Sequence, residues 1–192
     1  MKELGLPCSP PLWAPSLNSS LPFPRLRAQD PRRGRIHPAV RADILTVLEF
    51  FGAEVTYGLR SIELARSCGD AVHGLLLGRL LVPGRIVLYD QPSSPWLLPG
   101  RVPAQQLERL EAAGAEVEPA QCSGTLVTWP GETLKEFMLL DVLLHEIGHH
   151  ILQHHKGKRR ARIARTRDHE AYARTFAERY RLRYLEGRSA SQ

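Results

Sequence analysis

The sequence predicts an α+β fold in which a small mixed β-sheet packs on one long amphipathic helix. Apolar residues with a helical period fill residues 133–151, and short apolar runs bounded by Gly and Pro recur between residues 75 and 129. With 192 residues and 43% hydrophobic content, the chain is long enough for one well-cored domain. We therefore expect one domain and a short tail.

The tail is expected at the N-terminus, where prolines recur. Proline has no backbone N–H and fixes φ, so neither a helix nor a strand propagates through a segment that is rich in it. Residues 1–35 contain Pro7, Pro10, Pro11, Pro15, Pro22, Pro24 and Pro31. We expect residues 1–35 to be a disordered or extended tail and residues 36–192 to form the domain.

The first half of the domain is expected to alternate between helices and strands. Apolar residues at helical spacing predict a helix from Val40 to Phe51, ended by Gly52. Residues 53–57 are interpreted as a short strand and residues 61–68 as a second helix. The apolar runs at residues 75–82 and 85–89 predict sheet, and residues 85–89 are the clearest strand.

The second half is expected to lead into the long helix. A Pro-rich loop extends to about residue 103, a helix covers residues 104–113, and a strand covers residues 125–129. A turn then precedes the long helix, for which Thr133 is the expected N-cap and Glu136 its capping-box partner.

This long helix contains the sequence His145-Glu146-Ile147-Gly148-His149. Residues four apart lie about 40° apart around a helix, so His145 and His149 point the same way and can hold one ion. Neutral imidazole suits Zn²⁺ and leaves its bound water acidic, and Glu146 between the histidines can accept that proton. The apolar residues of this helix fall on the opposite face. The motif predicts one zinc ion per chain, held by His145 and His149, with Glu146 as general base.

A catalytic zinc has three protein ligands, and two candidates compete for the third place. His155 has the spacing of H-E-x-x-H-x-x-G-x-x-H, but Leu152 stands where that pattern needs a helix-breaking Gly. If the helix continues, His155 points about 120° away from His149. Glu170, 21 residues after His149, lies in another predicted helix over residues 168–177. Small residues at 173 and 177 on the side of Glu170 would allow this helix to approach closely, so we favour Glu170.

With Glu170 downstream of the motif, the chain resembles the gluzincin metallopeptidases, whose pattern is H-E-x-x-H followed by a Glu on the next helix. It is similar to the ImmA/IrrE branch or to minimal gluzincins, because small residues and Phe176-Ala177 follow that Glu. The ImmA/IrrE signature is Glu-Ala-Asn-x-Phe-Ala, whereas here Tyr172 replaces the Asn and Phe176-Ala177 comes two residues late. The resemblance covers residues 125–185. It implies a zincin-like fold with a helical lower half that supplies Glu170, and zinc-dependent peptide hydrolysis.

Several side chains near the motif have two interpretations each. Asp141 precedes His145 by one turn and either accepts the second N–H of that imidazole or is a solvated helix position. His169, Tyr172 and Tyr180 are available to stabilise the transition state, and the sequence does not choose among them. The His150 and His154 pair, also four apart, is either a second metal site or a filler at the rim of the core.

Substrate and partners are inferred from the same pattern. An extended peptide or protein substrate can add to a sheet edge, for which residues 85–89 or 125–129 are the candidates, so endopeptidase action is expected. The net charge of +6 and the basic connector at residues 156–167 favour an alternative function. In that alternative, the domain is a regulatory or nucleic-acid-associated module, with weak and non-specific nucleic-acid or acidic-partner contact at the connector.

The compartment is expected to be the cytoplasm. The three cysteines are odd in number, far apart and in no C-x-x-C pair, which fits a reducing environment and argues against a cysteine zinc site. No apolar run approaches the roughly 20 residues of a membrane helix.

Overall fold

The structure, a computed structural model, describes residues 23–67, 76–120, 123–155 and 166–190 and has the expected mixed α+β class. The helices are α1 (Arg41–Phe51), α2 (Ala53–Thr56), α3 (Ala104–Ala112), α4 (Thr133–Glu136), the π-helix η1 (Phe137–Leu143), α5 (Leu144–His155) and α6 (Arg167–Ser189). The strands are β1 (Arg25–Ala28), β2 (Arg35–Ile36), β3 (Ser61–Ala65), β4 (Gly78–Leu81), β5 (Arg85–Tyr89), β6 (Gln91–Pro92), β7 (Trp96–Leu98), β8 (Glu116–Pro119) and β9 (Thr125–Thr128). In these ranges no helix has both the length and the apolar character needed to cross a membrane.

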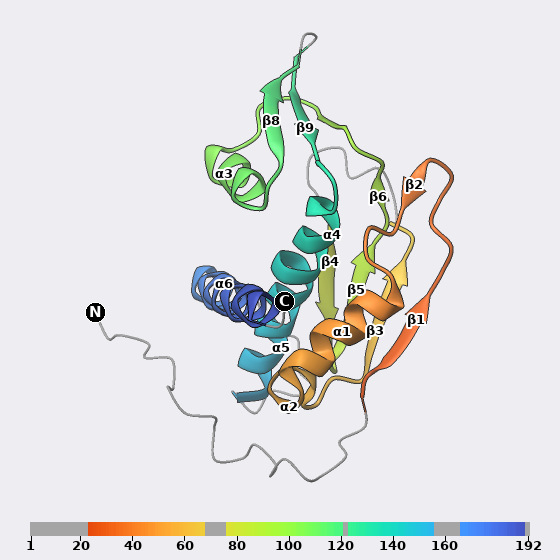
Figure 1. The fold of residues 1–192 in the computed structure, drawn as a ribbon, viewed down its shortest axis with the longest axis vertical. Coiled ribbons are helices and arrows are strands. Elements are labelled where there is room, and N and C mark those ends of the chain that lie inside the picture. Colours follow the sequence, from red (N-terminus) through yellow and green to blue (C-terminus); the bar gives the residue numbers. More distant parts are fainter. Residues whose placement is uncertain (1–22, 68–75, 121–122, 156–165, 191–192) are drawn as a thin grey trace, which may run out of the picture.

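The main sheet has the strand order β1-β3-β5-β4. Strands β1, β3 and β5 are parallel, and β4 joins the edge antiparallel to β5. The central strand β5 is buried from Ile86 to Tyr89, because its neighbours and the helices cover it. Helix α1 crosses in front of β3 and β5, and the continuous α4-η1-α5 helix runs beside it, with α5 against β4 (Figure 1). The core lies between the sheet and these helices.

Strand β1 shows that the domain begins before residue 36, so the expected boundary between tail and domain is wrong. Arg25–Ala28 pairs with Ser61–Leu64 of β3, and β2 pairs with β6. The four residues of β1 contain no proline, and a strand at the edge of a sheet needs backbone partners on only one side. The remainder of the expected tail, residues 1–22, lies outside the described residues.

Asp90 ties this N-terminal segment to the sheet. Its side chain is fully buried, and its carboxylate accepts from Arg32 N at 2.8 Å, Ser67 N at 2.9 Å and Arg35 Nε at 3.0 Å. Burial by itself would raise the pKa of Asp90, but the Arg32 and Ser67 N–H groups and the charge of Arg35 outweigh it and lower the pKa from 3.8 to about 2. The buried carboxylate is therefore stable as an ion.

This arrangement predicts a stability that depends on acid. The folded-state pKa of Asp90 lies below the unfolded-state value, so its contribution is complete above about pH 4 and is lost as the pH falls towards 2. The contribution amounts to about 2 kcal/mol. The free energy of unfolding, measured with urea, should fall between pH 6 and pH 2.5 in the unchanged protein. In Asp90→Asn this fall should be smaller by about 2 kcal/mol. Equal falls in Asp90→Asn and in the unchanged protein would refute this role of Asp90. The control is Asp168→Asn, because Asp168 is exposed and its replacement should leave the fall unchanged.

Two elements between α1 and β4 differ from the sequence prediction. Residues 53–57 were expected to be a strand, but the helix α2 forms there. Val55 N and Thr56 N both donate to Gly52 O, and the side chains of Val55 and Thr56 are buried. Residues 61–68 were expected to be a helix, but residues 61–65 form β3, with Ile62 and Leu64 buried. Hydrogen bonding to both β1 and β5 overrides the local helix preference of this segment.

A second sheet, of order β7-β9-β8, lies above the main one with α3 beside it (Figure 1). Helices α1 and α3 and strands β5 and β9 are confirmed, whereas β6, β7 and β8 form where no strand was expected. The second sheet is joined to η1 by an aromatic series. Trp96 packs edge-on against Trp129 at 5.2 Å between ring centroids, and Trp129 stacks on Phe137 at 4.9 Å.

The long helix begins at Thr133 as expected, but not through a capping box. Its N-cap is Glu132, which makes no side-chain cap, and Thr133 Oγ1 donates to Pro130 O at 2.6 Å. Between α4 and α5 the helix has π-helical turns over Phe137–Leu143. Such turns change the register between the residues before and after them. The residues that precede His145 therefore do not face the directions of a regular α-helix.

Candidate metal centre

Three side chains from two helices meet at one point. His145 and His149 of α5 have their Nε2 atoms 3.1 Å apart, and the Glu170 carboxylate of α6 lies 3.3 Å from His145 Nε2 and 3.4 Å from His149 Nε2. Three ligands of one tetrahedral zinc ion, at bond lengths near 2.0–2.1 Å, are about 3.3 Å apart. Among the described residues, this is the one group of three or more His, Cys, Asp or Glu side chains that fits an ion. These three side chains could therefore hold a metal ion.

The α5–α6 contact that brings Glu170 to the histidines depends on Gly148. A Cβ atom at residue 148 would lie 3.0 Å from Ala173 Cα and 3.1 Å from Phe176 Cβ. Ala173 is itself fully buried, so neither backbone can move away without disturbing the core. Glycine in the motif and alanine in α6 therefore set how closely the two helices approach.

Glu170 is positioned by the start of its helix. Thr166 is the N-cap of α6, with its Oγ1 accepting from His169 N at 3.4 Å, and Glu170 N bonds to Thr166 O at 3.1 Å. An anionic side chain in the first turn is stabilised by the helix dipole. The Glu170 side chain is 37% exposed, whereas the His145 and His149 side chains are 15% and 6% exposed. Solvent therefore reaches the site from the α6 side.

Glu146 lies on the sheet side of α5. Its side chain is buried, and Oε2 accepts from Leu80 N of β4 at 2.7 Å. Tyr89 N donates to Leu77 O, so the backbone N–H and C=O groups of residues 77, 79 and 81 point towards β5. The N–H and C=O groups of Leu80 therefore point away from β5. The outward backbone of the edge strand thus holds the Glu146 carboxylate in place.

The two candidates for the third ligand are treated differently by the structure. Helix α5 runs without a break through Leu152 to His155, so the turn that would return His155 to the site does not form. The side chain of His155 lies outside the described residues. Glu170 is the residue that lies beside His145 and His149.

The other residues selected from the sequence are not all close to this triad. Asp141 pairs with Arg181 of α6, with Arg181 Nη1 3.4 Å from Asp141 Oδ2. Burial raises the pKa of Asp141, with Arg181 and Arg109 opposing it. Tyr180 donates to Glu54 Oε2 at 3.1 Å, and lies about 15 Å along α6 from Glu170. Burial and Glu54 raise the pKa of Tyr180 to about 12.

Two candidates remain near the triad in sequence. Tyr172 is half-buried and stacks on Phe176 at 6.5 Å between ring centroids, and burial raises its pKa. His169 lies in the first turn of α6, and its side chain is partly exposed. Both lie within one turn of Glu170, so they stay candidates for contact with substrate.

Arg109 of α3 was not selected from the sequence. Its guanidinium lies over the Phe137 ring, 5.4 Å from the centroid. Burial lowers the pKa of Arg109, and the charge of Asp141 and, more weakly, the charges of Glu146 and Glu170 act to raise it. This guanidinium is therefore within electrostatic reach of the triad. No local pattern around residue 109 predicts this, since α3 is distant in sequence from α5 and α6.

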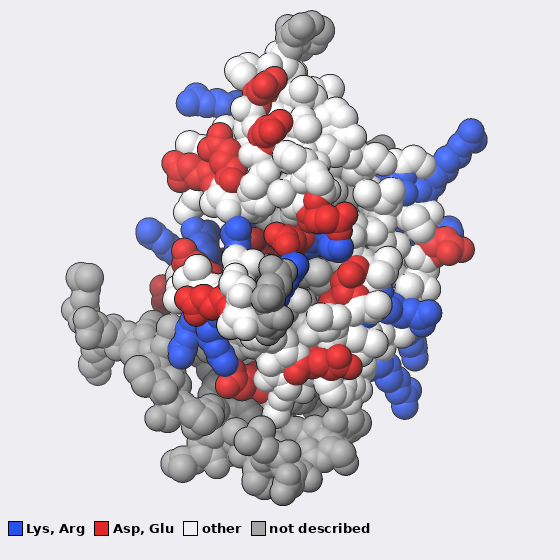
Figure 2. Space-filling model, in the orientation of Figure 1, with Lys and Arg blue, Asp and Glu red and all other residues white. Residues whose placement is uncertain are grey.

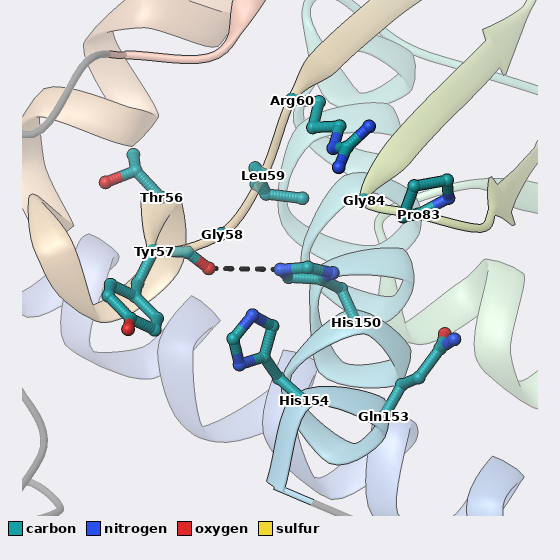
Figure 3. Close-up of a pocket in the computed structure, with 10 residues that line it drawn as sticks. All are labelled: Thr56, Tyr57, Gly58, Leu59, Arg60, Pro83, Gly84, His150, Gln153 and His154. Atoms are coloured by element: carbon teal, nitrogen blue, oxygen red, sulfur yellow. Dashed lines mark hydrogen bonds between the residues drawn. The ribbon is translucent and has the colours of Figure 1, made fainter. Parts of the chain in front are cut away.

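The pair His150 and His154 faces away from the triad. His150 is buried, and its Nε2 donates to Tyr57 O at 3.0 Å (Figure 3). Burial lowers the pKa of His150 to about 4, so the imidazole is neutral at neutral pH. His154 follows one turn later, with its ring 5.4 Å from that of His150 between centroids. These two histidines line a cavity separate from the triad.

Surface charge on the described residues is mixed. On the face shown in Figure 2, Lys and Arg side chains are interspersed with Asp and Glu side chains. Most of the basic connector, residues 156–165, lies outside the described residues, so the expected contact with nucleic acid has no structural test. Comparison of the chain with protein-family models, with curated proteins and with solved structures found no match.

Proposed function

We propose that this protein is a zinc metallopeptidase that hydrolyses internal peptide bonds. The observation that carries the proposal is the triad of His145, His149 and Glu170, whose ligand atoms lie 3.1–3.4 Å apart with Glu146 on the same helix. Two imidazoles and one carboxylate leave a fourth position open, which is typical of a catalytic rather than a structural zinc site.

The roles of the side chains follow from their positions. A bound zinc ion lowers the pKa of water and polarises the carbonyl group of the scissile bond. Glu146 accepts the proton from the attacking water and passes it to the leaving amine. The Leu80 N–H, which bonds to Glu146 Oε2, orients the carboxylate.

The substrate is proposed to lie along β4. Residues 85–89 and 125–129 were the expected docking strands, but β5 lies between β3 and β4, and β9 lies between β7 and β8. Both are therefore fully paired and cannot add a strand. Strand β4 is the edge of the main sheet nearest α5, and its Leu80 carbonyl faces outwards. An extended peptide bound there would pass close to Glu146.

Metal removal and return test the proposal. The purified protein should contain about one zinc ion at the triad, lose hydrolysis of a quenched-fluorescence peptide library after chelation, and recover it with added Zn²⁺. Metal content is measured by mass spectrometry, and circular dichroism checks that the chelated protein keeps its fold. A folded protein that takes up zinc at the triad but cleaves no peptide or protein substrate would refute peptidase function.

A further inference from the structure

A cavity lies beside α5, away from the triad. It has a volume of about 400 Å³ and lies between the α2–β3 connection, the β4–β5 turn and the C-terminal half of α5. His150, Gln153 and His154 line it from α5, and Tyr57 and Gly58 line it from the connection (Figure 3). The proposed hydrolysis uses none of these residues.

The Nε2 atoms of both imidazoles lie close to Gly58. A Cβ atom built at residue 58 would lie 2.5 Å from His154 Nε2 and 3.3 Å from His150 Nε2. Gly58 has φ +76°, a conformation that residues with a side chain rarely adopt. Glycine at this position therefore lets both imidazoles approach the α2–β3 connection closely.

A third donor atom lies beside the His150 nitrogen. Tyr57 O is 3.0 Å from His150 Nε2, close to the separation of about 3.3 Å between two ligands of a tetrahedral ion. Gly84 of the β4–β5 turn limits the other side, since a Cβ there would lie 2.6 Å from Gly58 O and 3.3 Å from His150 Cε1. Two aromatic nitrogens and one carbonyl oxygen thus meet in a shaped space that opens into a cavity large enough for water.

We propose that His150, His154 and the Tyr57 carbonyl form a second site, for a divalent transition-metal ion such as Zn²⁺, Ni²⁺ or Cu²⁺. Imidazole nitrogen suits these ions, whereas Mg²⁺ and Ca²⁺ prefer sites made of oxygen. Binding would replace the hydrogen bond from His150 to Tyr57 with two bonds to the ion, and the imidazole proton would move to Nδ1. Water from the cavity would complete the coordination.

The second site is independent of the triad and of the proposed hydrolysis. His149 and His150 are neighbours, so their side chains point about 100° apart around α5. The triad faces α6, whereas the second site faces the α2–β3 connection. An ion at the second site would join the C-terminal half of α5 to the segment that enters the main sheet. Because the ion binds the folded state, it would raise the unfolding temperature.

The test removes the first site and measures what remains. In the tag-free, full-length His145→Ala/His149→Ala variant, isothermal titration with Ni²⁺ should still show about one bound ion and a rise in unfolding temperature. Adding His154→Ala to this variant should weaken Ni²⁺ binding at least tenfold and abolish the rise in unfolding temperature. Cu²⁺ bound to the His145→Ala/His149→Ala variant should show nitrogen hyperfine structure in its electron paramagnetic resonance spectrum. His154 is only half-buried, so its replacement should leave a folded chain, as circular dichroism checks.

The matched control is His37→Ala in the same background, because His37 bonds to Gln29 O away from the cavity and should leave Ni²⁺ affinity unchanged. Loss of binding only with His154→Ala supports the site. Equal Ni²⁺ affinity with and without His154, or no ion bound by the parent variant, would overturn it. Either result is independent of whether the triad binds zinc or the protein cleaves peptides, because the triad histidines are absent throughout.

Discussion

Replacing Glu146 by Gln is expected to lower peptide hydrolysis by about 10²–10⁴-fold while zinc stays bound. Glutamine has the shape of glutamate and can still accept from Leu80 N through its carbonyl oxygen, so the local packing is preserved. It has no basic site for the proton of the attacking water at neutral pH. The loss should therefore appear in kcat, with zinc content unchanged.

Glu49→Gln is the matched control for this variant. Glu49 is an exposed glutamate on α1, outside the triad, so the same change of charge there should leave hydrolysis within a factor of about two. Measuring both variants on one fluorogenic peptide separates the loss of the base from a general effect of charge. Full turnover in Glu146→Gln would mean that Glu146 does not accept the proton, and the proposed mechanism would be abandoned.

The second large effect concerns the ligands. Glu170→Ala should weaken zinc binding by more than the roughly 10–100-fold that loss of an outer-shell partner causes, because it removes a direct bond to the ion. Replacing both His145 and His149 by Ala should abolish zinc binding at the triad. Competition with a fluorescent zinc chelator measures both affinities. To exclude zinc bound at the proposed second site, the competition is repeated in a His154→Ala background.

Asp168→Ala and His155→Ala are the controls for Glu170. Asp168 is an exposed carboxylate in the same first turn of α6, so its loss removes equal charge without removing a ligand. His155 ends a helix that does not turn back to the triad. If His155→Ala weakened zinc binding more than Glu170→Ala did, the third ligand would be His155, and the chain would need a helix break that α5 does not have.

The parts that could be predicted from the sequence are those that local periodicity controls. The helix that contains His145, Glu146 and His149 was predictable because its apolar residues repeat with the helical period on the opposite face. Glu170 was predictable as their partner because small residues accompany it on α6, and Ala173 does contact Gly148. Strand β5 was predictable because a central strand is apolar on both faces.

Tertiary contacts decided the rest. Residues 61–65 form a strand because β1 and β5 pair with them, and the π-helical turns over Phe137–Leu143 are not marked by any periodicity. The Leu80 N–H that holds Glu146 is a backbone group, present in every residue except proline, so no residue type marks it in advance. Helix periodicity is a property of neighbours in sequence. Edge strands, buried backbone donors and the approach of His150 and His154 to Gly58 depend instead on which distant segments the folded core brings together.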